Sequence, residues 1–297
     1  MGVLTKLQFD ILTTSEAAKR EISATEIAQI VGLSAEDVTN TLSELNAIGY
    51  MRNRHITDAG IMALEPYRVQ RAVILAAGFG SRMIPITLST PKPLVQVKGE
   101  RIIDSLLDAL EEVGIQDVII VRGYLAEQFD ILLEKYPHIK FIDNPVYDKT
   151  NNISSVLYAK DYLKNAYICE ADLLIQNKNI IKKYQYATNF LGVPVEKTDD
   201  WCFTSDEGLY ITSLKIGGTN CHHVYGISYW NEKDGTLLAE QVQRAFEIPA
   251  ARERLWDMVP FEYYLGSHKI SIRECCMEDI AEIDTFDELK IIDPTYR

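Results

Sequence analysis

The chain has 297 residues, a formal net charge of −13 and 47% hydrophobic residues, which bounds it as a globular protein of one or two domains. Its acidity argues against a general nucleic-acid surface, because phosphate binding requires basic patches. No apolar run reaches the roughly 20 residues that a membrane span needs, and the N-terminus lacks a signal-peptide core. The five cysteines form no CxxC pair and lie mostly in apolar runs, so we expect free, buried thiols in a cytoplasmic protein without a membrane partner.

Residues 1–67 are predicted to form a small α+β domain. The spacing Ser23-Ala24-Thr25-Glu26 is a capping box that begins the second helix, and Gly32-Leu33-Ser34 makes a tight turn before the third. Helices are expected over residues 4–18, 26–31 and 34–47, a hairpin over 49–57 and a last helix from Asp58. This pattern resembles the winged helix-turn-helix domain of many bacterial regulators.

DNA binding by this first domain is disfavoured by its charges. The helix that would enter the major groove contains Glu36, Asp37 and Glu44 and neither Lys nor Arg, so it would repel phosphates. Arg52 and Arg54 in the hairpin are the basic pair best placed to contact a DNA backbone. DNA binding is therefore left open, but we expect an accessory, dimerising or regulatory domain, which is consistent with a homodimer.

Residues 68–297 are predicted to form an α/β domain. Strands are expected over residues 73–76, 117–121, 140–143 and 166–169, and helices over 102–113, 125–136 and 153–163. This alternation indicates a Rossmann-like, doubly wound sheet that binds ligands at the carboxyl ends of its strands. After residue 193, strand-like pieces such as 209–216 and 224–230 dominate. They predict a mixed sheet in which the later strands form the acceptor side and a lid.

A glycine-rich turn follows the first of these strands. It reads Leu75-Ala76-Ala77-Gly78-Phe79-Gly80-Ser81-Arg82 and is followed by Pro91-Lys92-Pro93. Glycines at 78 and 80 let backbone N–H groups approach phosphate oxygens, and Arg82 and Lys92 add positive charge. The turn has no lysine where a Walker loop needs one, and Met83 stands where a dinucleotide-binding fingerprint needs a third glycine. The spacing instead predicts a nucleoside triphosphate site.

Two groups of carboxylates are candidates for a metal site. Asp172 follows a buried strand at the expected carboxyl edge of the sheet, where it could hold Mg²⁺ against a triphosphate. Glu282 and Asp284 flank Ile283 in a short strand and therefore point to the same face. One of them could supply a second metal ligand. The alternatives are that Asp172 caps a turn and that Glu282 and Asp284 form a solvated acidic edge.

Seven segments together resemble one family. They are Leu75 to Arg82, Thr90 to Val95, Gly123 to Phe129, Asn151 to Ser155, Glu170 to Asp172, Gly226 to Trp230, and Glu282 to Asp284. Over residues 71–292 the sequence resembles the bacterial phosphocholine cytidylyltransferases of choline incorporation. These belong to the larger nucleotidyltransferase family, which has a GT-A-like fold and also acts on sugar 1-phosphates.

The resemblance implies Mg²⁺-dependent transfer of CMP from CTP to phosphocholine, which releases pyrophosphate and gives CDP-choline. It implies catalytic roles for Arg82, Lys92, Asp172 and Asp284, of which the two aspartates hold the metal. No general base is needed, because the attacking phosphate oxygen is already ionised. The implied nucleotide-binding residues are Leu75, Ala76, Ala77, Gly78, Gly80, Ser81, Arg82, Lys92, Gly123, Tyr124, Asn152 and Ser155.

The expected acceptor-binding residues are Glu196, Lys197, Asp200, Trp201, Tyr229 and Glu282. A trimethylammonium group has no N–H to donate and favours aromatic faces, such as that of Trp201 in a polar loop. Lys197 departs from the phosphocholine pattern, and beside Asp199 and Asp200 it would equally suit a phosphonate with a primary ammonium. The alternative acceptor is therefore 2-aminoethylphosphonate.

Two further functions remain as alternatives. The chain could transfer a nucleotide to a sugar 1-phosphate. It could also be a transcriptional regulator that senses CTP or a CDP-alcohol, although a sensor has no need of the metal ligands. Zinc binding by Cys221, His222 and His223 is disfavoured, because adjacent residues of a strand point to opposite faces.

Overall fold

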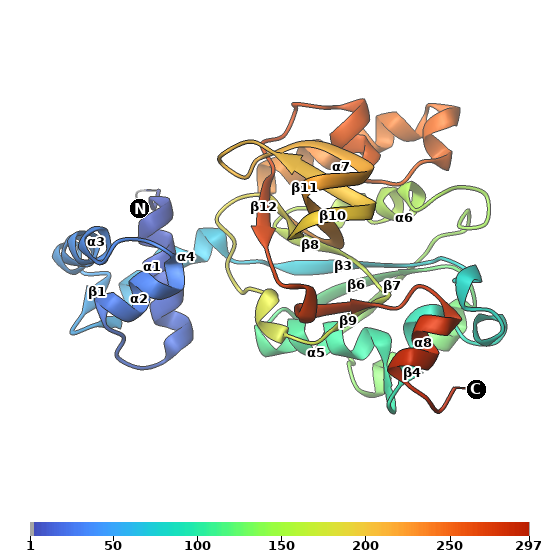
Figure 1. Cartoon of the computed structure of the whole chain (residues 1–297), viewed down its shortest axis with the longest axis horizontal. Coiled ribbons are helices and arrows are strands. Elements are labelled where there is room, and N and C mark those ends of the chain that lie inside the picture. The colour runs from blue at the N-terminus through green and yellow to red at the C-terminus, as the bar shows by residue number, and fades with distance from the viewer. Residues whose placement is uncertain (1–2, 297) are drawn as a thin grey trace. The chain divides into compact units, whose positions relative to one another are not determined.

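The computed structural model describes residues 3–296, and its contacts divide the chain into two compact units (Figure 1). The first unit extends to Arg68 and also contains Tyr184–Tyr186. The second consists of Val69–Lys183 and the residues from Ala187 onwards. Within residues 3–296, no helix has both the length and the apolar character that a membrane crossing requires.

The first unit has the element order that the sequence predicts. It contains α1 (Lys6–Ala18), α2 (Ala24–Val31), α3 (Ala35–Ala47), β1 (Met51–Arg52), β2 (His55–Ile56), α4 (Asp58–Leu64) and the 3₁₀ turn η1 (Glu65–Tyr67). The predicted capping box is present, since the Glu26 carboxylate accepts from the Ser23 N–H at 2.8 Å. The classification of this unit as a winged helix stays a prediction.

The segment Tyr184–Tyr186 joins the first unit through aromatic packing that the sequence pattern did not indicate. The rings of Tyr186 and Tyr67 stack with centroids 5.6 Å apart, and Phe9 lies 5.3 Å from Tyr186. The Tyr186 hydroxyl also donates to the Leu4 carbonyl at 3.1 Å. This short stretch of a distant part of the chain is therefore part of the core of the first unit.

The second unit is built on a mixed sheet of seven strands in the order β12-β10-β11-β8-β3-β6-β7. The strands are β3 (Arg71–Ala76), β6 (Asp117–Arg122), β7 (Lys140–Asp143), β8 (Ala166–Glu170), β10 (Asn189–Ser205), β11 (Ile211–Trp230) and β12 (Ser271–Glu274). Strand β3 pairs in parallel with β6 and β8, and β6 with β7, whereas β11 is antiparallel to β8 and β10. The predicted α/β fold with a mixed sheet is confirmed.

Helices cover both faces of this sheet, as Figure 1 shows for α5 on one side and α6 and α7 on the other. The helices are α5 (Ile102–Glu112), α6 (Ile153–Tyr158), α7 (Glu232–Phe246) and α8 (Phe286–Ile292). Alternating residues of β3 point to opposite faces, so Ile74 packs in the cluster with Leu106 of α5, while Val73 packs in the cluster with Val156 of α6. Both faces of the central strands are consequently apolar.

Short elements connect these layers. They are η2 (Ser81–Met83), η3 (Ile86–Leu88), η4 (Lys92–Leu94), β4 (Gln96–Val97), β5 (Glu100–Arg101), η5 (Ala126–Glu134), η6 (Lys160–Tyr162), β9 (Leu173–Ile175), η7 (Lys178–Ile180), η8 (Pro249–Glu253), the π-helix η9 (Val259–Tyr263), η10 (Met277–Asp279) and β13 (Ile280–Glu282).

Three expected elements differ from the structure. The helix expected over residues 125–136 is the 3₁₀ helix η5, and that over 153–163 divides into α6 and η6. The two strands expected after residue 209 are one long strand, β11, which pairs with β10 along most of its length. This pairing also places Trp201 within β10, where a loop was expected, because residues 197–205 find partners on β11.

Candidate active site

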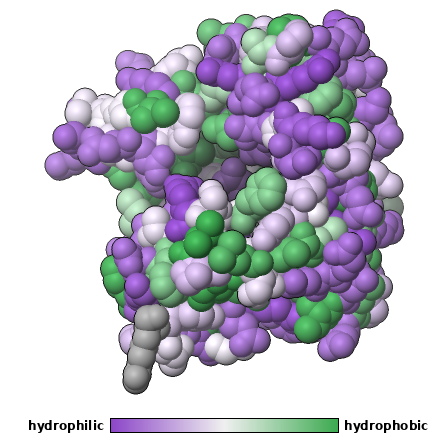
Figure 2. Space-filling model, turned by 90° about the vertical axis from the view of Figure 1, so that its right-hand side faces the viewer, coloured by the Kyte–Doolittle hydropathy of each residue, from purple (hydrophilic) through white to green (hydrophobic). Residues whose placement is uncertain are grey.

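A cavity of about 530 Å³ opens where β3 and β8 end. The face at these strand ends is hollowed, and both hydrophilic and hydrophobic residues border the hollow (Figure 2). All of the predicted nucleotide-binding residues except Gly123 and Tyr124 line the cavity. The glycine turn, Arg82, Lys92 and the metal-ligand candidates therefore meet at one site, as the strand order requires for ligands of a doubly wound sheet.

Gly80 has to be glycine for two reasons. Its φ angle is +62°, in the left-handed region that side chains disfavour, and a Cβ there would lie 2.9 Å from Cβ of Lys92. The missing side chain lets Lys92 pack directly against the turn. In contrast, a Cβ on Gly78 would meet no atom within 4 Å, so the space beside Gly78 is available to a ligand.

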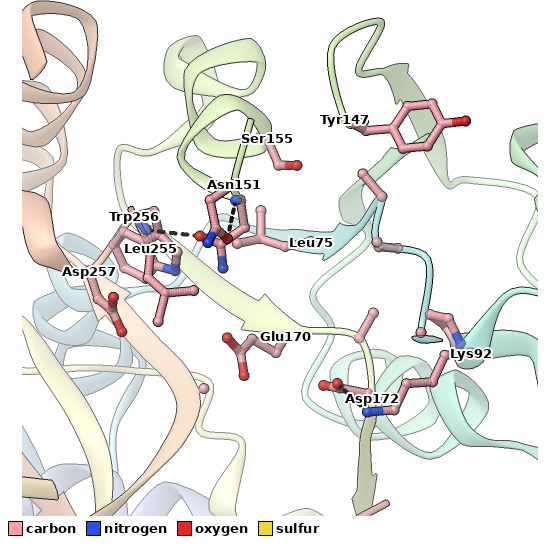
Figure 3. Close-up of a pocket in the computed structure, with 18 of the residues that line it drawn as sticks. Leu75, Lys92, Tyr147, Asn151, Ser155, Glu170, Asp172, Leu255, Trp256 and Asp257 are labelled. Atoms are coloured by element: carbon pink, nitrogen blue, oxygen red, sulfur yellow. Dashed lines mark hydrogen bonds and ion pairs between the residues drawn. The ribbon is translucent and has the colours of Figure 1, made fainter. Parts of the chain in front are cut away.

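Lys92 connects the two predicted metal ligands. Its Nζ lies 2.8 Å from Oδ2 of Asp172, as Figure 3 shows for these two residues, and 2.8 Å from Oδ1 of Asp284. Arg82 donates to the same Asp284 oxygen at 2.7 Å. Burial disfavours the charged ammonium of Lys92, but attraction to Asp172 and hydrogen bonds to both aspartates outweigh it and raise its pKa. Lys92 is thus a fixed positive charge at the centre of the site.

The pairing of β13 with β9 brings the distant carboxylates to Asp172. Glu282 lies opposite Leu173, the first residue of β9, which follows Asp172 directly in the chain. Ligand oxygens of Asp172, Glu282 and Asp284 all lie within 4.8 Å of one another. Burial, and then the charges of Asp172 and Asp284, raise the pKa of Glu282 to about 8.

This donor set fits a hard divalent cation. Three carboxylates at one point are typical ligands of Mg²⁺, and Oδ1 of Asp172 is buried with no hydrogen-bond partner within residues 3–296. No other group of three or more potential ligands occurs among these residues. In particular, Cys221, His222 and His223 form no such group, and His222 instead lies 2.9 Å from Glu274.

A second pair of carboxylates, Glu170 and Asp257, lines the cavity beyond Asp172, and neither was predicted from the sequence as a site residue. Glu170 ends β8, and its carboxylate lies over Gly226, where a Cβ would come within 2.3 Å of Oε2. Asp257 faces the cavity from the segment between η8 and η9, as Figure 3 shows. Burial raises the pKa of Asp257 to about 6 and that of Glu170 well above its ordinary value.

The start of α6 holds the segment that contains Asp257. Oδ1 of Asn152 accepts from the Trp256 N–H at 2.8 Å, and the backbone N–H of Asn151 donates to the Arg252 carbonyl at 2.7 Å. The side-chain oxygen of Asn152 is therefore occupied by the protein backbone, although the residue does line the cavity as predicted for the nucleotide. Ser155 also lines it and accepts from Nδ2 of Asn144 at 3.1 Å.

Two predicted nucleotide-binding residues lie outside the cavity lining. A Cβ on Gly123 would lie 2.6 Å from Cγ of Tyr147, so the glycine makes room for that ring, and Tyr147 lines the cavity instead. The hydroxyl of Tyr124 donates to the Leu88 carbonyl at 3.3 Å. Tyr147 was not predicted as a site residue, because it lies in a turn with no recognisable motif.

The predicted acceptor residues divide into two sets. Asp200, Trp201 and Glu282 line the cavity, whereas Glu196 and Lys197 are exposed outside it. Tyr229 is also outside, because its ring points into the core on the α5 side of the sheet and packs edge-on against Tyr167 at 5.9 Å.

Comparison with known proteins extends these observations. Residues 71–199 match the family model described as nucleotidyl transferase. A 2-aminoethylphosphonate cytidylyltransferase of Lancefieldella rimae is 35% identical over 76% of this chain and 92% of that protein. A choline-phosphate cytidylyltransferase of Haemophilus influenzae is 30% identical over 73% of this chain and 93% of that protein.

A solved structure gives the same picture of the fold. The CTP:phosphocholine cytidylyltransferase of Streptococcus pneumoniae superimposes with a TM-score of 0.71 at 28% identity, and covers 77% of this chain and 100% of that one. The matched regions contain the glycine turn and Lys92. The chain is an enzyme that belongs to the nucleotidyltransferase family and, within that family, to the cytidylyltransferases.

Proposed function

We propose that this enzyme transfers the cytidylyl group of CTP to 2-aminoethylphosphonate. The observation that carries the proposal is the chemistry of the cavity wall around Asp200 and Trp201, which is rich in carboxylates and poor in open aromatic faces. The relative from Lancefieldella rimae, named for this acceptor, also aligns at higher identity than those named for choline phosphate.

Aromatic rings at this wall are mostly engaged with one another. Trp256 is 4% exposed and stacks on Phe190, with ring centroids 5.8 Å apart and planes 18° from parallel. Tyr229 is in the core, so Trp201 is the predicted aromatic residue left to contact an acceptor. A trimethylammonium group would need several such faces. Carboxylates instead suit a primary ammonium, which has three N–H donors.

The reaction needs charge and orientation more than acid–base chemistry. An ionised phosphonate oxygen attacks the α-phosphorus of CTP, a new P–O bond forms in line, and the bond to the β-phosphate oxygen breaks to release pyrophosphate. Arg82 and Lys92 bind the phosphates and stabilise the charge that develops on them. Asp172, Asp284 and Glu282 would hold Mg²⁺, which supplies further positive charge at the same point.

The binding of phosphates would compete with the ion pairs of the free protein. Lys92 and Arg82 both contact Asp284 in the present arrangement, and a triphosphate would attract both cations. Their partner carboxylates would then be available to the metal. This exchange keeps the positive charge of Lys92 close to the reacting phosphorus throughout.

Pyrophosphate release with CTP and Mg²⁺ tests the proposal, with 2-aminoethylphosphonate and phosphocholine supplied in separate reactions. We expect a higher kcat/KM for the aminophosphonate. Phosphocholine is the second candidate, because the Haemophilus and Streptococcus relatives are named for it. A higher kcat/KM for phosphocholine would establish that candidate and contradict ours.

For the first unit we propose a winged-helix accessory role rather than DNA binding. Its element order supports that fold, and Glu36 and Asp37 on α3 are exposed where a recognition helix would need cations. A gel-shift assay with the DNA upstream of the protein's own gene, at stated salt, tests this assignment. A sequence-specific retarded band would contradict it.

A further inference from the structure

The segment between η8 and η9 contributes three residues to the cavity, Leu255, Trp256 and Asp257. Burial raises the pKa of Asp257 to about 6, although hydrogen bonding to the backbone N–H groups of Asp257 and Met258 acts to lower it. Oδ1 of Asp257 is buried and has no hydrogen-bond partner within residues 3–296. The described part of the chain therefore leaves this oxygen without a donor.

Glu170 faces Asp257 across the same part of the cavity (Figure 3). Both residues line this cavity, and the Glu170 carboxylate lies over Gly226. Neither Glu170 nor Asp257 forms an ion pair with any residue between 3 and 296, and Lys92 is already bonded to Asp172 and Asp284. Both carboxyl groups thus lie in the cavity without a cationic partner from the described part of the chain.

A cationic group of the ligand would supply the missing partner of these carboxyl groups, and a second metal ion fits the site poorly. Asp257 is not part of any group of three carboxylates or other metal ligands within 4.8 Å in the described chain. An ammonium group needs fewer partners, and each of its N–H donors can bond one carboxylate oxygen. Oδ1 of Asp257 lacks such a donor, and a trimethylammonium group could not provide one.

We propose that Asp257 and Glu170 bind the primary ammonium group of the acceptor, with Trp256 forming the wall behind it, and that they select this acceptor over quaternary amines. The inference rests on the proposed function and assigns the residues that recognise its acceptor. Asn152 is a positioning residue in this scheme, because it holds the Trp256 backbone. Gly226 is a second positioning residue, because a side chain at position 226 would displace the Glu170 carboxylate.

The test compares two acceptors in the full-length protein: 2-aminoethylphosphonate and ethylphosphonate, which lacks the ammonium. Asp257→Asn removes the charge with little change in shape. We expect it to lower kcat/KM for 2-aminoethylphosphonate by about tenfold or more, the size of one lost charge-assisted hydrogen bond. The kcat/KM for ethylphosphonate and the KM for CTP should change by less than about threefold, because neither ligand contacts Asp257 through a cation.

Asp199→Asn is the matched control. It makes the same substitution next to Asp200, but the Asp199 side chain is 94% exposed and does not line the cavity. It should leave both acceptors unaffected. Glu170→Gln provides a second variant and should show the same selective loss, so the inference stays testable if Asp257→Asn does not fold.

The outcomes separate the inference from the proposed function. An equal loss for both acceptors in both variants, or no loss, would overturn the ammonium site while leaving the function intact. Wild-type turnover of phosphocholine without turnover of 2-aminoethylphosphonate would instead overturn the proposed function, and the selectivity inferred here with it.

Discussion

At the scale of single residues, Glu282 shows how neighbouring carboxylates and burial change the protonation of a site residue. Its carboxyl group has an ordinary pKa of 4.5, which burial and then the charges of Asp172 and Asp284 raise to about 8. Because this pKa is higher in the folded than in the unfolded protein, protonated Glu282 contributes stability that is fully present below about pH 4.5. That contribution is lost as the pH rises through about 8. The protein without metal should therefore lose stability over this range.

Bound Mg²⁺ should reverse this trend, because it favours ionised carboxylates. We predict that the increase in Tm caused by Mg²⁺ grows between about pH 6 and about pH 8.5, and that Glu282→Gln makes the increase smaller and less dependent on pH. Thermal unfolding with and without Mg²⁺ measures both effects, with Asp199→Asn as the control. An Mg²⁺ effect that is the same at both pH values, or in the variant, would remove Glu282 as a metal ligand.

Individual site residues were predictable from sequence where a local pattern defines them. The glycine turn, Arg82 and Lys92 follow a strand at short, fixed spacing, and they line the cavity. Tyr229 could not be placed in this way. Alternation along β11 shows that Tyr229 and Trp230 point to opposite faces, but not that the face of Tyr229 is covered by α5.

At the scale of elements, the contact between α6 and the segment 252–257 shapes the acceptor side of the site. Two backbone N–H groups and the Asn152 side chain connect these parts of the chain, which are about a hundred positions apart. No local pattern marks residues 255–257 as part of a site. They were missed because only tertiary hydrogen bonds bring them to the cavity.

This contact leads to a prediction that differs from a direct nucleotide role for Asn152. Asn152→Ala removes the acceptor of the Trp256 N–H, and one such bond contributes about 1 kcal/mol, or roughly fivefold in an equilibrium constant. We expect the KM for the acceptor to rise about fivefold and the KM for CTP to change less. Steady-state kinetics with each substrate varied in turn measures this difference.

Asn179→Ala is a suitable control, because Asn179 is exposed in η7 and does not line the cavity. If Asn152→Ala raised the KM for CTP more than that for the acceptor, its side chain would act on the nucleotide after all, and the positioning role would be wrong.

The strand pairing at the other side of the cavity was easier to anticipate. Alternation in the sequence predicted Glu282 and Asp284 on one face of a short strand; their ligand oxygens do lie close together, but β13 ends at Glu282 and Asp284 follows it. Which strand they would join was not predictable, because β9 has only three residues and no distinctive pattern. The long β10–β11 hairpin was missed for a similar reason, since its register shifts interrupt the alternation along each strand.

At the scale of the whole molecule, every residue that lines the cavity belongs to the second unit. We therefore predict that removal of residues 1–67 leaves kcat for cytidylyl transfer within about twofold of the full-length value, as expected for independent parts. The truncated protein should unfold at a lower temperature or aggregate more readily, because Tyr184–Tyr186 lose the partners that they have in the first unit. Kinetics and thermal unfolding of the two proteins measure these effects.

A truncated protein that is folded but has lost tenfold or more of its kcat would contradict an accessory role. The first unit would then contribute to catalysis itself. Tyr186→Ser in the truncated chain tests whether exposed aromatic surface causes the loss of thermal stability. If it does, this substitution should restore stability without changing kcat.

The most direct measurement of the central claim is a competition in one reaction. The enzyme is supplied with CTP, Mg²⁺ and equal concentrations of 2-aminoethylphosphonate and phosphocholine, and the two cytidylyl products are quantified by mass spectrometry at low conversion. The product ratio then equals the ratio of kcat/KM values for the two acceptors. Our account predicts that the cytidylyl aminophosphonate dominates, and a dominant CDP-choline product would contradict it.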